Sequence, residues 1–74
     1  MKKEIETTNL SSKQIKILVE LDNASGKRIE FQKLEEILEI SYSELRIQLN
    51  DLLILGIIDD SNGYISITPR AYKN

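Results

Sequence analysis

The hydrophobic and polar positions divide the chain into three amphipathic helices and a hairpin. Apolar residues recur at helical spacing over residues 12–22, 31–40 and 42–55. A short run at Lys27–Glu30 lies between the first two helices and has room for a single short strand. The order helix, strand, helix, helix, strand, strand predicts a small α+β fold.

Capping-box sequences mark the starts of the first and third helices. Ser11 is followed three positions later by Gln14, and Ser41 is followed in the same way by Glu44. The second box comes directly after the helix at 31–40, so only a tight turn fits between these two helices. This spacing is typical of a helix-turn-helix unit.

The C-terminal part of the chain predicts a β-hairpin. Gly56 ends the third helix, and two short apolar runs then flank the sequence Asp-Ser-Asn-Gly. Asn62 and Gly63 both tolerate a positive φ angle, so the pair is a strong signal for a tight hairpin turn.

Helical spacing also predicts which side chains face the core. The first helix is expected to bury one side made of Ile15, Leu18, Val19 and Asp22, with Leu21 at its edge. Ile17 is then expected to point outward. The core face of the third helix contains Tyr42, Leu45, Leu49, Leu52 and Leu53. The opposite, outward face contains Ser43, Glu44, Ile47, Asn50, Asp51 and Ile54, with Arg46 at the boundary.

Composition excludes most chemistry. The 74 residues fit one domain, and they include no histidine and no cysteine, which removes the commonest metal ligands, general bases and thiol nucleophiles. There is also no glycine-rich phosphate loop, so we expect no enzyme activity, no metal or cofactor site and no small-molecule substrate. No run is apolar enough for a signal peptide or a membrane span, and the lack of cysteine suits a reducing cytoplasm.

The segment ISYSELRIQLNDLLILGIIDDSNGYISITPRAY resembles the second half of a winged helix-turn-helix domain. It is similar to the short archaeal winged-helix family of transcriptional regulators and chromatin-associated proteins. The matching features are SYSEL at the start of the recognition helix, the leucine spacing that follows, LGII before the wing, and GYISIT followed by Pro69. We therefore expect a winged domain over residues 10–74, preceded by a flexible arm over residues 1–9.

The resemblance implies that the third helix enters the major groove of DNA while the wing contacts the backbone. The DNA-contacting residues implied in this chain are Ser43, Arg46, Ile47 and Asn50 on the helix and Ser61 and Asn62 on the wing. Lys27, Arg28 and Arg70 are further candidate phosphate contacts because they are basic. Two features depart from the family. Arg46 is followed by Ile47 where family members carry consecutive basic residues, and the wing tip carries Asp59 and Asp60 where wings that grip DNA carry Lys or Arg. The net charge of −2 also lacks the basic balance that is usual in nucleic-acid binders.

The sequence leaves two functions open. The first is sequence-dependent binding of double-stranded DNA by a transcriptional regulator, expected as a homodimer because single modules bind weakly. Its dimer contacts would come from the first helix, the N-terminal arm or exposed isoleucines. The alternative function is a protein-interaction module without DNA affinity that uses Ile47 and Ile54. As an alternative to the homodimer, the chain is expected to be one module of a longer protein.

Overall fold

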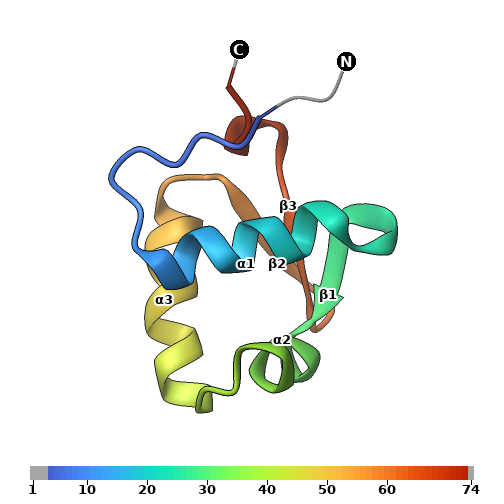
Figure 1. Ribbon diagram of the computed structural model, residues 1–74. Helices are drawn as coiled ribbons and strands as arrows, with labels where there is room; N and C mark the ends of the chain where they lie inside the picture. The colour runs from blue at the N-terminus through green and yellow to red at the C-terminus, as the bar shows by residue number, and fades with distance from the viewer. Residues whose placement is uncertain (1–3, 74) are drawn as a thin grey trace.

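The computed structural model describes residues 4–73 and has the α+β architecture expected from the sequence (Figure 1). The α-helices of the described part are α1 (Ser12–Asn23), α2 (Phe31–Leu38) and α3 (Tyr42–Ile54). The strands are β1 (Arg28–Glu30), β2 (Ile58–Ser61) and β3 (Tyr64–Ile67). Two short 3₁₀ helices, η1 (Ser25–Lys27) and η2 (Pro69–Ala71), precede β1 and follow β3.

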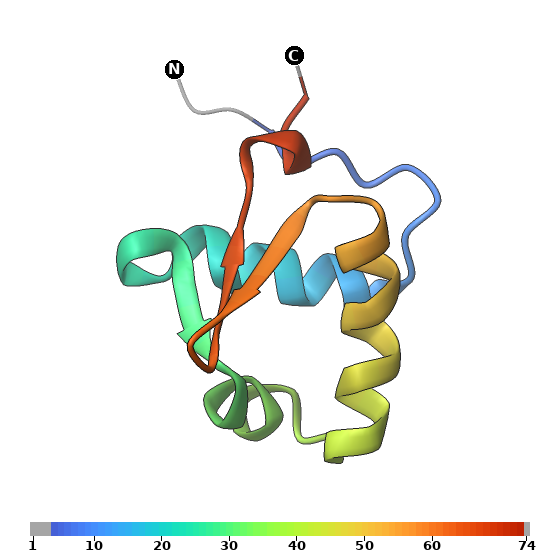
Figure 2. The same ribbon diagram turned by 180° about the vertical axis from the view of Figure 1, so that it is seen from behind.

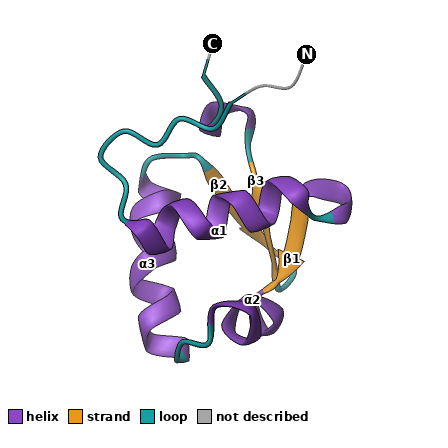
Figure 3. Ribbon diagram, in the orientation of Figure 1, coloured by secondary structure: helices purple, strands orange, loops and turns teal. Residues whose placement is uncertain are grey.

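The strands form one antiparallel sheet in the order β1-β3-β2 (Figure 3). β3 is central, and its Ile65 pairs with Ile29 of β1 on one side. The predicted hairpin turn is confirmed, because Asn62 and Gly63 both have positive φ angles, 55° and 80°. This turn type matches the twist of the two strands that it joins.

The helices lie on one side of the sheet. α1 crosses one sheet face, and the view from behind shows the strands in front of α1 with no described helix over them (Figure 2). α2 lies beside the hairpin turn, and the Phe31 N–H donates to the carbonyl of Gly63 at 3.0 Å. Only residues 39–41 separate α2 from α3, which confirms the tight turn between these helices.

The core is made of aliphatic side chains from the three α-helices and from strands β2 and β3. The fully or nearly fully buried members of this cluster are Ile17, Leu18, Leu21, Leu34, Leu45, Leu49, Leu52, Ile58 and Ile65. Burial of one such side chain contributes about 1.5–3 kcal/mol to the free energy of folding. These contacts therefore supply most of the stabilisation in a domain that has no disulfide.

The predicted core face of α1 was partly wrong. Ile17 was expected to point outward but is fully buried, whereas Val19, expected in the core, is 42% exposed. The helix is rotated because the polar Gln14 also takes a buried position, where its amide donates to the carbonyl of Gln48 at 3.3 Å. A prediction that counts only apolar positions misses such a residue.

The predicted core face of α3 is largely confirmed. Leu45, Leu49 and Leu52 are fully buried, but Tyr42 is 61% exposed and its ring packs against the ring of Phe31, with centroids 5.1 Å apart. Phe31 occupies the start of α2 beside the hairpin. Tyr42 therefore lies at the edge of the core, not in it.

The two predicted capping boxes have different outcomes. Ser11 and Gln14 form a complete box, with both reciprocal hydrogen bonds present. The Ser41 hydroxyl accepts from the N–H of Glu44 at 3.2 Å, but the Glu44 carboxylate does not return to Ser41. It accepts instead from the side chain of Gln48 at 2.9 Å, one turn further along α3.

The N-terminal segment pairs with the end of the chain. The Glu6 N–H donates to the carbonyl of Ala71 at 2.7 Å, and the Lys73 N–H donates to the carbonyl of Glu4 at 2.8 Å. Residues 4–6 of the expected flexible arm are thus hydrogen-bonded to the C-terminal segment, while Lys2 and Lys3 lie outside the described residues.

A partly buried hydrogen bond connects the C-terminal segment to α1. The Tyr72 hydroxyl donates to Oδ1 of Asp22 at 2.6 Å, and Nζ of Lys27 lies 3.1 Å from the same oxygen. Burial raises the pKa of Tyr72 to about 12, with the hydrogen bond to the Asp22 carboxylate and its negative charge acting in the same direction. The neutral phenol is therefore the form that the fold stabilises.

We predict that Tyr72→Phe lowers the free energy of unfolding by about 1–2 kcal/mol at neutral pH, because it removes a hydrogen bond to a charged acceptor. This contribution is complete below the unfolded-state pKa of 10.0 and is lost as the pH rises through about 12. Urea unfolding followed by circular dichroism, at neutral pH and then across this alkaline interval, measures both effects.

Tyr42→Phe is the matched control, since the exposed Tyr42 hydroxyl makes no hydrogen bond to the described residues. It should leave the unfolding free energy nearly unchanged. Equal losses in the two variants would contradict the role assigned to the Tyr72–Asp22 bond.

Candidate nucleic-acid interface

The outward face of α3 is set by the leucines that the helix buries. Because Leu45, Leu49 and Leu52 occupy the core, the side chains of Ser43, Ile47 and Asn50 are left exposed to solvent. Ile47 has 63% of its surface exposed, which is high for an aliphatic residue. The four candidate residues on α3, these three and Arg46, therefore lie together along one side of the helix.

Arg46 connects α3 to the hairpin. Its Nη1 lies 3.3 Å from Oδ2 of Asp60 on β2, and its guanidinium carbon lies 5.5 Å from the centre of the Phe31 ring. The side chain is half-buried between these partners. Asp60 was not predicted as a partner, because 14 residues separate the pair and only the return of the chain along β2 brings them together.

The hairpin presents polar and acidic side chains. Ser61, at the end of β2, and Asn62, in the turn, are both exposed as the resemblance required. The exposed Asp59 and Asp60 precede them, and the hairpin from Ile58 to Ile67 contains no basic residue. The wing can therefore offer hydrogen bonds to a backbone but contributes no attraction for phosphate.

Three other candidate residues lie apart from the α3 face. Lys27 is in η1, where its Nζ bonds to the carbonyl and carboxylate of Asp22, and Arg28 on β1 stacks over the Tyr64 ring at 4.7 Å. Both residues follow α1 in the chain, and the end of α1 from which they continue is the one far from α3 (Figure 1). Arg70 is in η2, beside the backbone that follows α3.

Most described cations already have an acidic partner. The sequence has ten Lys and Arg residues, and eight remain once Lys2 and Lys3 are set aside. Five of these eight lie within ion-pair distance of a carboxylate, in the pairs Lys13–Glu44, Lys27–Asp22, Lys33–Glu36, Arg46–Asp60 and Lys73–Glu4. Apart from Lys27–Asp22, whose carboxylate is largely buried, these are exposed pairs of the kind that contributes about 0–1 kcal/mol each, so a phosphate can replace the carboxylate at small cost.

The two acidic residues predicted on the outward face are engaged with α1. Oδ2 of Asp51 accepts from the amide of Gln14 at 3.3 Å, and Oε1 of Glu44 lies 3.6 Å from Nζ of Lys13. The hydrogen bond from Gln48, together with the Lys13 charge, lowers the pKa of Glu44 and keeps it ionised. Both acids therefore lie at the edge of the α3 face nearest α1.

Other kinds of site receive no support from the described residues. Residues 4–73 contain no group of three or more acidic side chains arranged to hold a metal ion. None of the described helices combines the length and the apolar character needed to cross a bilayer. The α3 face and the hairpin beside it are thus the candidate site.

Comparison with known protein families, curated proteins and solved structures found no match to this chain.

Proposed function

We propose that this chain is a winged helix-turn-helix domain that binds double-stranded DNA, with α3 in the major groove and the β2–β3 turn on the neighbouring backbone. The element order α1-β1-α2-α3-β2-β3 and the strand order β1-β3-β2 support the winged-helix assignment. The short connection at residues 39–41 supports it as well. A role in transcription regulation follows from the same resemblance.

The observation that carries the proposal is the exposed polar side of α3. Asn50 has an amide that can donate to and accept from an adenine edge, and Ser43 can reach a base or a phosphate. Ile47 can pack on a thymine methyl group. The major groove is wide enough to admit an α-helix such as α3, Tyr42–Ile54.

Arg46 is the cation best placed to serve this face. It lies between α3 and the hairpin, where a phosphate beside the groove would approach both elements. The Arg46 guanidinium is ion-paired with Asp60 in the protein alone, so a DNA phosphate has to displace the Asp60 carboxylate. With a net charge of −2 and few unpaired cations among residues 4–73, non-specific affinity should be modest and should fall steeply with salt.

A second candidate function is a protein-interaction module without DNA affinity. It is favoured by the exposure of Ile47 and Ile54, at 63% and 76%, on the same side of α3. Exposed aliphatic side chains seven residues apart fit an apolar partner better than a phosphate backbone. The two functions make opposite predictions for the polar residues of α3.

We predict that a labelled random-sequence duplex binds the protein in fluorescence anisotropy at about 50 mM salt and binds several-fold more weakly at about 200 mM. Arg46→Ala should weaken binding and lower the salt slope by about one, because one phosphate contact is lost. Asn50→Ala should weaken binding to a specific site by about tenfold, because a base contact is lost.

Lys16→Ala and Asn23→Ala are the controls for these variants. They remove a cationic side chain and an amide side chain from exposed positions of α1, and we expect affinity close to that of the unchanged protein. If the duplex does not bind even at low salt and no specific site restores binding, the DNA proposal is wrong. Loss of a protein partner on Ile47→Asp, with Arg46→Ala silent, would then support the interaction module.

We also predict that Asp60→Asn increases DNA affinity several-fold, because it releases Arg46 and removes a negative charge beside the bound phosphate. The fold should tolerate this change, since an exposed ion pair contributes at most about 1 kcal/mol. The same anisotropy titration measures the effect.

Glu4→Gln is the matched control for Asp60→Asn. It also breaks one surface ion pair, Lys73–Glu4 at 3.6 Å, and changes the net charge by the same amount. Glu4 belongs to the N-terminal segment, at the end of the molecule opposite the hairpin turn (Figure 1). Equal gains in DNA affinity in the two variants would mean that net charge alone sets the affinity and that the release of Arg46 contributes nothing.

A further inference from the structure

A second exposed apolar surface lies where α3 ends. It consists of Leu10, Ile54, Leu55 and Ile57, and we call it the Leu55 surface. Ile54 and Leu55 are 76% and 53% exposed, and Leu10 and Ile57 are partly buried against the core. The surface joins the segment before α1 to the turn after α3.

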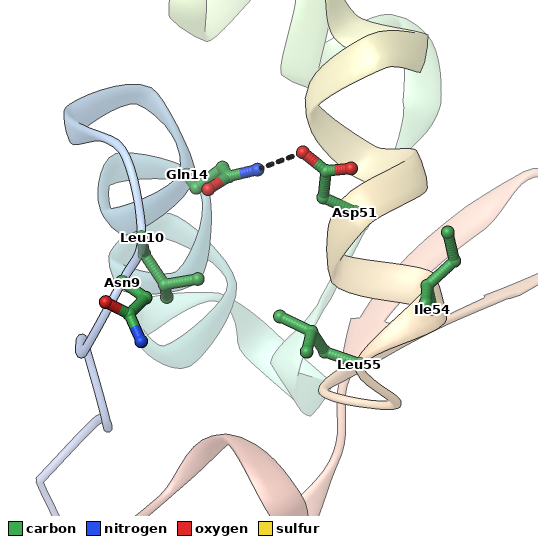
Figure 4. Close-up of a pocket in the computed structure, with 6 residues that line it drawn as sticks. All are labelled: Asn9, Leu10, Gln14, Asp51, Ile54 and Leu55. Atoms are coloured by element: carbon green, nitrogen blue, oxygen red, sulfur yellow. Dashed lines mark hydrogen bonds between the residues drawn. The ribbon is translucent and has the colours of Figure 1, made fainter.

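Two hollows flank Leu55. The first has a volume of about 310 Å³ and is lined by Asn9, Leu10, Gln14, Asp51, Ile54 and Leu55. Figure 4 shows Leu10 and Leu55 facing each other across this hollow, with the Gln14–Asp51 hydrogen bond at its edge. The second has a volume of about 290 Å³ and also contains Leu10 and Leu55, together with Glu6, Thr8, Ile57 and Arg70.

Local structure explains why these apolar side chains reach the surface. The helix stops at Ile54, and Gly56 adopts a φ angle of +76° that turns the chain toward β2. Leu52 fills the core and Leu53 packs against it, so the two residues that follow face solvent. Burying such an aliphatic side chain against a partner is worth about 1.5–3 kcal/mol.

Opposite charges lie on opposite sides of Leu55. Asp51 lines the first hollow, and Arg70 lines the second, where its guanidinium is next to Gly56. Asp51 accepts the hydrogen bond from Gln14 but lies within ion-pair distance of no described cation, and Arg70 lies within that distance of no described acid. Glu6, the acidic residue that lines the second hollow, accepts hydrogen bonds from the hydroxyl and the N–H of Thr8.

We propose that a second copy of this chain docks on the Leu55 surface, with Arg70 of each copy against Asp51 of the other. A twofold axis beside Leu55 brings the acidic side of one surface onto the basic side of its mate, and it stacks the apolar centres. A self-complementary arrangement of this kind is what an isologous interface requires. A different partner would need its own matching pair of charges, whereas a second copy supplies them without further assumption.

The position of this surface is compatible with DNA binding but does not depend on it. The last turn of α3 lies at the end of the helix opposite α2 and the hairpin turn (Figures 1 and 2). Ser43 and Arg46 lie in the first turns of α3, away from Ile54 and Leu55. An interface of standard size buries about 800 Å² per copy, and the isolated chain has an accessible surface of 4998 Å². The dimer is therefore expected to be reversible and concentration-dependent.

Sedimentation equilibrium over a wide range of protein concentration, without DNA, tests this proposal. We expect a monomer–dimer equilibrium in which Asp51→Arg and Arg70→Asp each raise the dissociation constant at least about tenfold. The double variant Asp51→Arg/Arg70→Asp should restore the dimer, because the charge pair is re-formed with its signs exchanged. Leu55→Asp should abolish the dimer.

Matched controls separate the interface from general charge and hydrophobic effects. Lys16→Asp reverses a charge on α1, and Val19→Asp removes an exposed apolar side chain there; both should leave the dimer intact. If Asp51→Arg unfolds the protein, Asp51→Asn keeps an oxygen acceptor for Gln14 while removing the charge. Circular dichroism checks the fold of each variant.

Two results would overturn the proposal. The first is a wild-type chain that stays monomeric at every concentration. The second is a dimer that ignores the single charge reversals or is not restored by the double variant. Because DNA is absent from the experiment, neither result bears on the DNA-binding proposal, which is tested by anisotropy alone.

Discussion

The buried leucine stripe of α3 is the constraint on which the rest of the structure depends. Leu45, Leu49 and Leu52 are fully buried in the cluster that also contains Leu18 of α1 and Ile65 of β3. Their spacing fixes the rotation of the helix about its axis. A rotation that buried Asn50 instead would leave its amide without a partner, at a cost of about 1–3 kcal/mol. The exposed side of α3 is therefore a consequence of core packing.

Hydrogen bonds from polar side chains then connect elements that are far apart in the chain. Gln14 donates to the carbonyl of Gln48 and to Asp51, joining α1 to α3, and Tyr72 donates to Asp22, joining the C-terminal segment to the other end of α1. A domain of 74 residues buries a smaller fraction of its surface than a large protein does, so such bonds matter more in it. No described buried side-chain polar atom lacks a hydrogen-bond partner.

The exposed side of α3 divides into two chemically different parts. Ser43, Arg46 and Asn50 lie before its last turn, next to an acidic hairpin, and the last turn carries Ile54 beside Leu55. The polar part suits directional hydrogen bonds, and the apolar part suits a packed interface. If both proposals hold, weak electrostatic attraction is offset by pairing two reading helices in one dimer. Specificity would then come from geometry more than from net charge.

The sequence by itself determined the local structure. Capping at Ser11, the leucine spacing of α3 and the Asn62–Gly63 turn act over a few residues, so periodicity and residue type are enough to predict them. Tertiary structure decided everything that needs a distant partner. It buried Ile17 in place of Val19 and brought Lys13 of α1 to Glu44 of α3. It also paired Arg46 with Asp60 and Tyr72 with Asp22, across 14 and 50 residues. Sequence spacing carries no signal over such separations, because the packing of whole elements sets which side chains meet.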